Sequence, residues 1–274
     1  MNIKLIAFDL DGTTLRTDKT ISPHTVTAMR HAAERGCMIL PASGRVASNI
    51  PADVLALPGV RYLITSNGAL AIDRELQKTV YSNLMTEEET GALLRHLYDA
   101  GCFAEAYCGG KSYSDRLAMP RLMTLHPSED FLAFLRHSQI FVDDLPKYAA
   151  EHRFRLEKIN VPMLPPELFS RLSHELEAGG VFATCSSLVG NLEINRAGCT
   201  KAEALESLCK ILGVRREEVM AFGDSGNDLA MLRFAGLGVA VNNSTTEILE
   251  AADSITAAND DDGVALAIEK FVLA

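Results

Sequence analysis

The sequence lacks the patterns that mark several large classes of protein. None of its 274 residues lies in an apolar run near the roughly 18 residues that a membrane-spanning helix needs. Its basic side chains form no cluster or stripe, and 26 Lys and Arg stand against 36 Asp and Glu, a formal net charge of −10. Since such a chain repels nucleic acid, we expect neither a membrane nor a nucleic acid as a partner.

Patterns for zinc binding and for export are missing as well. The six cysteines form no CxxC pair, and no pair of histidines lies near them at zinc-binding spacing. We therefore expect reduced thiols that are mostly buried. The amino-terminal apolar run is short and ends at Asp9, so the hydrophobic region of a signal peptide is absent. These features lead us to expect a cytoplasmic protein.

What the sequence does contain is an alternation of short apolar runs and helical patterns. Each run ends in a small, polar, turn-forming cluster, as strands of a parallel sheet commonly do. The runs at 3–8, 37–42, 62–65, 219–222 and 237–241 end in DLDGTT, SGR, SNGA, GDSGND and NNST, respectively. We expect all five polar loops to open on one side of one sheet.

The middle of the chain has a different character. A capping-box helix begins at Thr86, and a Gly109-Gly110 turn separates two strand-like runs. A strand, an amphipathic helix and a hairpin are then predicted at 155–161, 166–178 and 181–194. The length also favours two domains, because domains commonly have about 100 to 200 residues.

These patterns predict an α/β protein with a Rossmann-like parallel-sheet core and an inserted α+β cap domain. We assign residues 1–82 and 191–274 to the core and residues 83–190 to the insert. We expect the insert to lie over the mouth of the core sheet.

The polar loops contain the groups that phosphoryl transfer needs. In open α/β sheets the ligand site lies beyond the carboxyl ends of the strands. If Asp9 ends the central strand, Asp11 lies about 6.5 Å further along and initially faces the same way. One carboxylate can then attack while the other handles a proton. Gly12 permits a sharp turn that brings backbone N–H groups close to phosphate oxygens.

Positive charge around the phosphoryl oxygens is the second requirement. Ser43 and Gly44 offer a hydroxyl and amides at a predicted helix start, and Lys201 offers an ammonium group. Because the net negative charge repels phosphate at long range, a local cation is also needed.

Oxygen ligands for Mg²⁺ are present in two of the polar loops. The carboxylates of Asp9 and Asp224 and the main-chain carbonyl of Asp11 form a sufficient set. We expect Asp228 to act through water or by orienting Asn227.

Taken together, these motifs resemble the haloacid dehalogenase-like hydrolase superfamily. The resemblance is carried by DLDGTT at 9–14, SGR at 43–45, SNGA at 66–69, Lys201 in GCTKAEAL and GDSGND at 223–228. The chain is similar, more narrowly, to the Cof-type phosphatases, which carry a large α+β (C2-type) cap. Residues 252–268 resemble the usual ending of that family.

The resemblance implies an aspartyl-phosphate mechanism. Asp9 would attack phosphorus, while protonated Asp11 donates to the leaving oxygen and later activates water. Ser43 and Lys201 would hold the transferred group, and Asp224 the Mg²⁺. The margin of the pocket would be formed by residues that include Arg45, Asn67 and Asn227.

The chain departs from the family pattern at two places. Asn242-Asn243-Ser244 stands where Gly-Asn-Ala is usual, and Thr14 stands where Leu is usual. The first change raises a question about the conformation of that loop, since Asn adopts left-handed backbone angles less readily than Gly does.

The sequence therefore predicts a Mg²⁺-dependent phosphatase of a small phosphorylated metabolite, either a sugar phosphate or a cofactor phosphate. A phosphomutase-type phosphotransferase shares the same nucleophile and metal and stays open as an alternative. A non-catalytic phospho-aspartate signalling module is disfavoured, because it needs neither the insert nor the second acidic loop. Both a monomer and a homodimer are compatible with the sequence.

Overall fold

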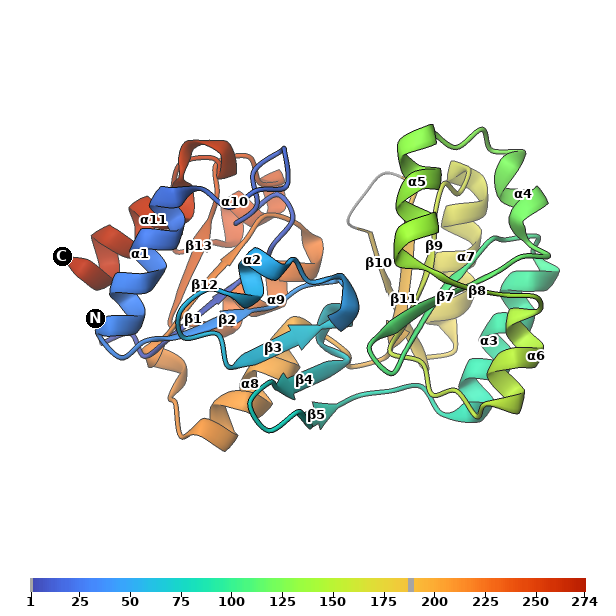
Figure 1. The fold of residues 1–274 in the computed structure, drawn as a ribbon, viewed down its shortest axis with the longest axis horizontal. Coiled ribbons are helices and arrows are strands. Elements are labelled where there is room, and N and C mark those ends of the chain that lie inside the picture. The colour runs from blue at the N-terminus through green and yellow to red at the C-terminus, as the bar shows by residue number, and fades with distance from the viewer. Residues whose placement is uncertain (1, 187–189) are drawn as a thin grey trace. The chain divides into compact units, whose positions relative to one another are not determined.

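The computed structural model of the chain describes residues 2–186 and 190–274. The chain divides into two compact units (Figure 1). The first contains the chain up to Arg45 together with Ile50–Ser82 and Thr200–Ala274, and the second contains Val46–Asn49 and Asn83–Cys199. Residues 1–82 and 191–274, which the sequence predicts as the core, overlap the first unit except at 46–49 and 191–199.

The first unit is built on a five-stranded parallel sheet with the order β14-β13-β12-β1-β2. Its strands are β1 (Leu5–Phe8), β2 (Met38–Pro41), β12 (Val219–Gly223), β13 (Leu237–Ala240) and β14 (Ser254–Ile255). Phe8 lies opposite Phe222 on one side and Pro41 on the other, so β1 is an interior strand between β12 and β2. The predicted parallel-sheet core is confirmed.

The predicted third strand of that sheet lies elsewhere. β3 (Tyr62–Thr65) pairs antiparallel with β4 (Leu70–Asp73), which pairs antiparallel with β5 (Lys78–Ser82). The link from β3 towards the parallel sheet is a single parallel bridge between Ala42 and Ile64. The prediction of β3 as a full member of the parallel sheet was wrong. The tight turn after Thr65 lets β3 form its ladder with β4, and within the described residues only Ile64 bridges to the segment after β2.

Helices cover both faces of the parallel sheet (Figure 1). Side chains of β1 alternate between them: Ile6 and Phe8 join one apolar cluster, and Leu5 and Ala7 join the other. This burial on both faces explains why the strands are apolar throughout. Helices α1 (Pro23–Glu34), α2 (Ala52–Leu55) and α11 (Gly263–Ile268) contribute to the first cluster, and α8 (Lys201–Leu212), α9 (Leu229–Phe234) and α10 (Thr246–Ala251) to the second.

The second unit is an α+β structure, as predicted. Its six-stranded sheet has the order β10-β11-β9-β6-β7-β8 and is antiparallel except for the β7–β8 pair. The strands are β6 (Glu105–Cys108), β7 (Lys111–Asp115), β8 (Ile140–Val142), β9 (Lys158–Val161), β10 (Phe182–Cys185) and β11 (Leu192–Arg196). The helices are α3 (Glu87–Asp99), α4 (Met119–Met123), α5 (Glu129–Ser138), α6 (Leu145–Glu151) and α7 (Pro166–Ala178).

The local signals of the insert correspond to observed contacts. Thr86 and Glu89 form the predicted capping box at the start of α3, and Gly109-Gly110 connects β6 to β7. β10 and β11 pair as the predicted hairpin, although residues 187–189 between them lie outside the described residues. β11 also pairs with β9, so it belongs to the second unit and lies beyond the boundary we drew after residue 190.

The cysteines are free and mostly buried, as expected from the sequence. Cys37, Cys102, Cys199 and Cys209 are buried thiols, and Cys108 and Cys185 are half-buried ones. In the part of the chain that the structure describes, every helix is too short or too polar to cross a membrane.

The sheet of the second unit has one apolar and one polar face. Ala106, Ile159 and Ile194 pack in the apolar cluster that includes residues of α3, α6 and α7. On the alternate positions, Glu105 lies opposite Asn160 across the β6–β9 pair. Gln139 Nε2 and Asn160 Nδ2 donate to the two carboxylate oxygens of Glu105, at 2.6 and 3.1 Å. Glu105 is thus a buried acid held by neutral amides.

Titration of Glu105 should make folding depend on pH. Burial raises its pKa from an ordinary 4.5 to about 7, although the Asn160 hydrogen bond opposes the shift. The protonated folded form contributes its stability in full below pH 4.5, and this contribution is lost as the pH rises through about 7. The difference between the two pKa values corresponds to a change of roughly 3 kcal/mol in the free energy of unfolding.

We therefore expect Glu105→Gln to remove this part of the pH dependence. The free energy of unfolding, measured with urea at pH 5 and pH 8, should fall with pH in the wild type and change less in the variant. Glu88→Gln, at an exposed position of α3, serves as the control and should keep the wild-type slope. Equal slopes in all three proteins would contradict the assignment.

Candidate active site

The loops at the carboxyl ends of β1 and β12 and the start of α8 meet at one buried lysine. Lys201 is the first residue of α8 and is completely buried. Its Nζ lies 2.6 Å from Asp9 Oδ1 and 2.6 Å from Asp228 Oδ1. Asp9 directly follows β1, and its N–H donates to Phe222 O in β12 at 3.1 Å. Residues 192 positions apart are therefore joined by one charge-assisted contact.

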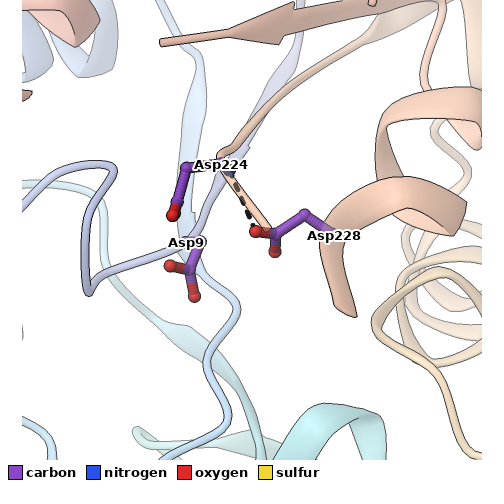
Figure 2. Close-up of side chains that lie close together, drawn as sticks. All are labelled: Asp9, Asp224 and Asp228. Carbon is purple, nitrogen blue, oxygen red and sulfur yellow. Dashed lines mark hydrogen bonds between the residues drawn. The ribbon is translucent and has the colours of Figure 1, made fainter. Parts of the chain in front are cut away.

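Three carboxylates converge at this point (Figure 2). One oxygen from each of Asp9, Asp224 and Asp228 can be chosen so that all three lie within 4.8 Å of one another. Asp228 Oδ2 accepts from the backbone N–H groups of Asp224 and Ser225, at 3.1 and 3.2 Å. Asp228 thus fixes the loop that carries Asp224, while its other oxygen holds Lys201.

The negative charge of the three carboxylates exceeds the positive charge of Lys201, which favours binding of a further cation. Three carboxylates face one ammonium, so the fully ionised group carries a net charge of −2. Burial raises the pKa of Asp9 well above its usual value against the influence of Lys201, and burial raises the pKa of Asp224 to about 6. Burial alone would lower the pKa of Lys201, but Asp228 and Asp9 outweigh it and raise that pKa.

The donor set fits a hard divalent ion such as Mg²⁺, which prefers a few carboxylates together with waters. Asp9 and Asp224 offer carboxylate oxygens to such an ion. Both oxygens of Asp228 are already hydrogen-bonded to Lys201 and to backbone amides.

Asp11 lies outside this group of three. Its carboxylate accepts two bonds of 2.7 Å from Arg45 Nε and Nη2 and one of 3.0 Å from Lys19 Nζ. Partial burial would raise the pKa of Asp11, but the two cations outweigh it and lower that pKa to about 2. The Asp11 side chain is therefore an ionised partner of Arg45 in this structure.

Gly12 and Thr13 join the turn after Asp9 to Asp224. Gly12 has a left-handed φ of +79°, and a Cβ placed on it would lie 2.7 Å from Asp224 Oδ2. Thr13 Oγ1 donates to Asp224 Oδ1 at 2.6 Å. Only a residue without a side chain fits between this turn and the acid, as the sequence suggested for Gly12.

The SGR and SNGA loops pair with each other. Ser43 is buried, and its Oγ accepts from the N–H of Arg45 at 3.1 Å. The N–H of Asn67 donates to Ser43 O, and that of Ser66 donates to Arg45 O. Gly44 lies inside this turn. Contrary to our expectation, Ser43 and Gly44 do not begin an α-helix, because these cross-loop bonds hold the segment in a turn.

Asn67 also reaches the acidic loop. It has a left-handed φ of +61°, and its Oδ1 accepts from Asn227 Nδ2 at 3.2 Å. Asn227 is held in addition by Ser225, whose hydroxyl donates to Asn227 Oδ1 at 2.9 Å. The structure thus connects the predicted pocket residues of three loops.

Sequence reasoning missed two residues of this site. Thr13 was read only as part of DLDGTT, although it bonds Asp224 directly. Lys19 lies outside every motif and reaches Asp11 from the following loop. A hydroxyl directly after the Gly12 turn was a usable signal for the first, whereas nothing in the sequence singles out the second.

We expect Gly12→Ala to abolish most of the activity. The new methyl group would be strained at this φ and would displace Asp224, and a 1 Å misplacement can cost about 100-fold in rate. Phosphate release from an aryl phosphate measures the loss. Gly226→Ala is the control, because its Cβ would have no neighbour within 4 Å. Equal activity of both variants would contradict the proposed crowding.

Thr14, where the family usually has Leu, carries a second testable feature. Its hydroxyl is buried and has no hydrogen-bond partner among the residues that the structure describes. Since an unsatisfied buried hydroxyl costs about 1 kcal/mol or more, Thr14→Val should stabilise the protein. Thermal unfolding should show a higher midpoint for Thr14→Val than for the wild type. Thr27→Val, which removes a hydroxyl bonded to Pro23 O, should bring no such gain. A lower midpoint for Thr14→Val would count against this interpretation.

Comparisons with known proteins agree with this geometry. The haloacid dehalogenase-like hydrolase family matches residues 6–268. A 5-amino-6-(5-phospho-D-ribitylamino)uracil phosphatase of Bacillus subtilis is 28% identical, covering 100% of this chain and 97% of the relative. An HMP-PP phosphatase of Yersinia pestis is 30% identical over 89% of this chain and 86% of the relative.

A solved structure extends the likeness to the fold. A haloacid dehalogenase-like hydrolase from Bacteroides thetaiotaomicron matches with a TM-score of 0.80 at 29% identity, covering 98% of this chain and 99% of that one. The predictions of the fold and of an enzyme with phosphatase relatives are confirmed. The chain belongs to the haloacid dehalogenase-like hydrolases.

Proposed function

We propose that the chain is a Mg²⁺-dependent phosphatase that hydrolyses a small phosphorylated metabolite through an aspartyl-phosphate on Asp9. The observation that carries this proposal is the buried contact of Asp9 with Lys201, beside Asp224, at the carboxyl ends of the neighbouring strands β1 and β12. We assign Asp9 as the nucleophilic carboxylate, Lys201 as the fixed positive charge and Asp224 as the acid that would hold a metal. These are the components that phosphoryl transfer needs.

The reaction proceeds in two displacements. A carboxylate oxygen of Asp9 forms a bond to phosphorus as the bond to the leaving oxygen breaks, and protonated Asp11 donates its proton to that oxygen. Asp11, now ionised, takes a proton from a water molecule that attacks the phosphorus of the aspartyl-phosphate. Phosphate leaves and the Asp9 carboxylate is restored.

Asp11 must exchange partners to play this role. In the structure its oxygens are bound by Arg45 and Lys19, which favours the ionised form. An incoming phosphoryl group competes for the same guanidinium, because Arg binds phosphate and carboxylate with the same paired geometry. Arrival of substrate would thereby free Asp11 to carry its proton.

Mg²⁺ would be held by the carboxylates of Asp9 and Asp224 and by the main-chain carbonyl of Asp11. When bound, it supplies positive charge next to the phosphoryl oxygens. Asp228 supports the site by orienting Lys201 and the Asp224 backbone. Ser43, Gly44 and Lys201 would surround the transferred group.

The substrate is proposed at the level of a class. The relatives named above act on a phosphorylated uracil derivative and on HMP-PP, so a small phosphorylated metabolite is the natural extension to this chain. We assign the insert, residues 83–190 by sequence, the role of a cap that selects the organic part of the substrate. We also propose a cytoplasmic location, where such metabolites occur.

A phosphomutase would use the same residues, but its final phosphoryl acceptor would be a substrate hydroxyl and not water. Free phosphate released without a bisphosphate activator supports hydrolysis, and interconversion of two phosphate isomers supports the mutase. A signalling module is disfavoured by the enzyme family to which the chain belongs.

We expect Asp9→Asn to abolish turnover, because a carboxamide is a poor nucleophile and cannot form the acyl phosphate that a carboxylate forms. Phosphate release is measured over a panel of sugar phosphates and cofactor phosphates, with Mg²⁺ present and after chelation. Asp53→Asn, an exposed acid in α2, is the matched control and should retain activity. Retained turnover in Asp9→Asn, or full activity in the chelated wild type, would overturn the mechanism.

A further inference from the structure

The loop that follows β13 is connected to the turn that carries the proposed nucleophile. Asn243 Nδ2 donates to Gly12 O at 2.7 Å. On its other side, Asn243 Oδ1 accepts from the backbone N–H of Asn259 at 2.9 Å. One exposed asparagine side chain therefore links the Gly12 peptide group to a second loop near the carboxyl end of the chain.

The same loop also holds the acid on the neighbouring strand. The N–H of Thr245 donates to Asp224 O at 3.0 Å, and Ser244 Oγ lies 3.3 Å from Gly223 O. Asp224 in turn accepts from Thr13, which directly follows Gly12. The contacts close a ring that runs through Asn243, Gly12, Thr13, Asp224 and Thr245.

The ring acts on the most crowded point of the site. Gly12 lies so close to Asp224 that a single methyl group would not fit between them. The bond from Asn243 fixes the plane of the Gly12–Thr13 peptide, and the bond from Thr245 fixes the backbone of Asp224. The loop after β13 thus fixes the distance between the Asp9–Gly12 turn and Asp224 through the bonds of Asn243 and Thr245.

We propose that Asn243 is a positioning residue for the reaction: by donating to Gly12 O, it keeps the turn after Asp9 in register with Asp224. This inference rests on the proposed function, since it concerns the same nucleophile and the same metal ligands. Asn243 itself touches neither the phosphoryl group nor the ion.

A second set of hydrogen bonds, which does not involve Asn243, separates the role of Asn243 from the attachment of the loop that carries Asn259. Asn259 Nδ2 donates to Leu15 O at 2.9 Å, and Asp260 accepts from the N–H and hydroxyl of Thr17. These contacts hold the second loop, which carries Asn259, to residues 15–17 independently of Asn243. Loss of the Asn243 amide should therefore loosen the Gly12 turn while the second loop stays attached.

The backbone conformation of the loop gives no reason for the presence of Asn at positions 242 and 243. Neither Asn242 nor Asn243 adopts a left-handed φ, so the backbone of this loop does not require a glycine at either position. Asn242 is also exposed, and its recorded main-chain bond to Ala257 O involves no side-chain atom. The adjacent Asn242 is consequently a matched control for the loss of an amide side chain.

The test compares Asn243→Ala, Asn243→Asp and Asn242→Ala. Asn243→Asp is decisive, because it keeps the oxygen that accepts from Asn259 but has no N–H to donate to Gly12. Steady-state hydrolysis of p-nitrophenyl phosphate at saturating Mg²⁺ gives kcat and KM. Calorimetric titration with Mg²⁺ alone gives the affinity of the ion, and thermal unfolding gives the stability.

We expect both Asn243 variants to lower kcat about fivefold with little change in KM, since one hydrogen bond of this kind is worth about 1 kcal/mol and about 1.4 kcal/mol is tenfold in rate. Both should also bind Mg²⁺ more weakly than the wild type does. Asn242→Ala should match the wild type in all three measurements.

Two outcomes would overturn the inference. Wild-type kcat and Mg²⁺ affinity in Asn243→Asp would show that donation to Gly12 is not needed. A lower unfolding temperature of the Asn243 variants, with both of those values unchanged, would assign the residue a structural role. Failure of the proposed function has a different signature, because Asp9→Asn would then stay active while the Mg²⁺ titrations of the Asn243 variants still report on the position of Asp224.

Discussion

The contact of Lys201 with Asp9 and Asp228 is the interaction on which the rest of the site depends. A buried ammonium is stable only beside compensating charge, and buried carboxylates need the same in return. The cation lies in the first turn of α8, where the helix dipole disfavours it. The two carboxylates offset that cost, and in doing so they bring the ends of β1, β12 and α8 to one point.

Much of this arrangement could be predicted from the sequence, because it follows from strand endings. Asp9, Gly12 and Asp224 come together through the parallel sheet, in which carboxyl ends share an edge, and Lys201 joins them from the start of α8. What could not be predicted depends on contacts between loops. β3 forms its ladder with β4 because a turn with left-handed residues reverses the chain, and periodicity alone does not report such a turn.

The partners of Asp11 show the same limit more sharply. The motif predicts an acid beside the nucleophile, but the bonds from Arg45 and Lys19 arise from two loops whose paths are set by tertiary packing. The boundary of the insert failed for a related reason. The hairpin predicted at 181–194 crosses the boundary drawn after residue 190, and β11 pairs with β9 as well as with β10, so its hydrogen bonds place it in the second unit.

The division of the first unit between both ends of the chain has a consequence for its synthesis. β1 leaves the ribosome early, whereas its neighbour β12 and the lysine of α8 follow only after the whole insert has been made. Contacts of such long sequence separation form late, and units with local contacts form sooner. The insert can therefore fold while one edge of β1 still lacks its partner β12. During that interval the hydrogen-bonding groups on this edge are open to wrong partners, and the contacts of Lys201 with Asp9 and Asp228 cannot both form until β12 and the loop after it have been made.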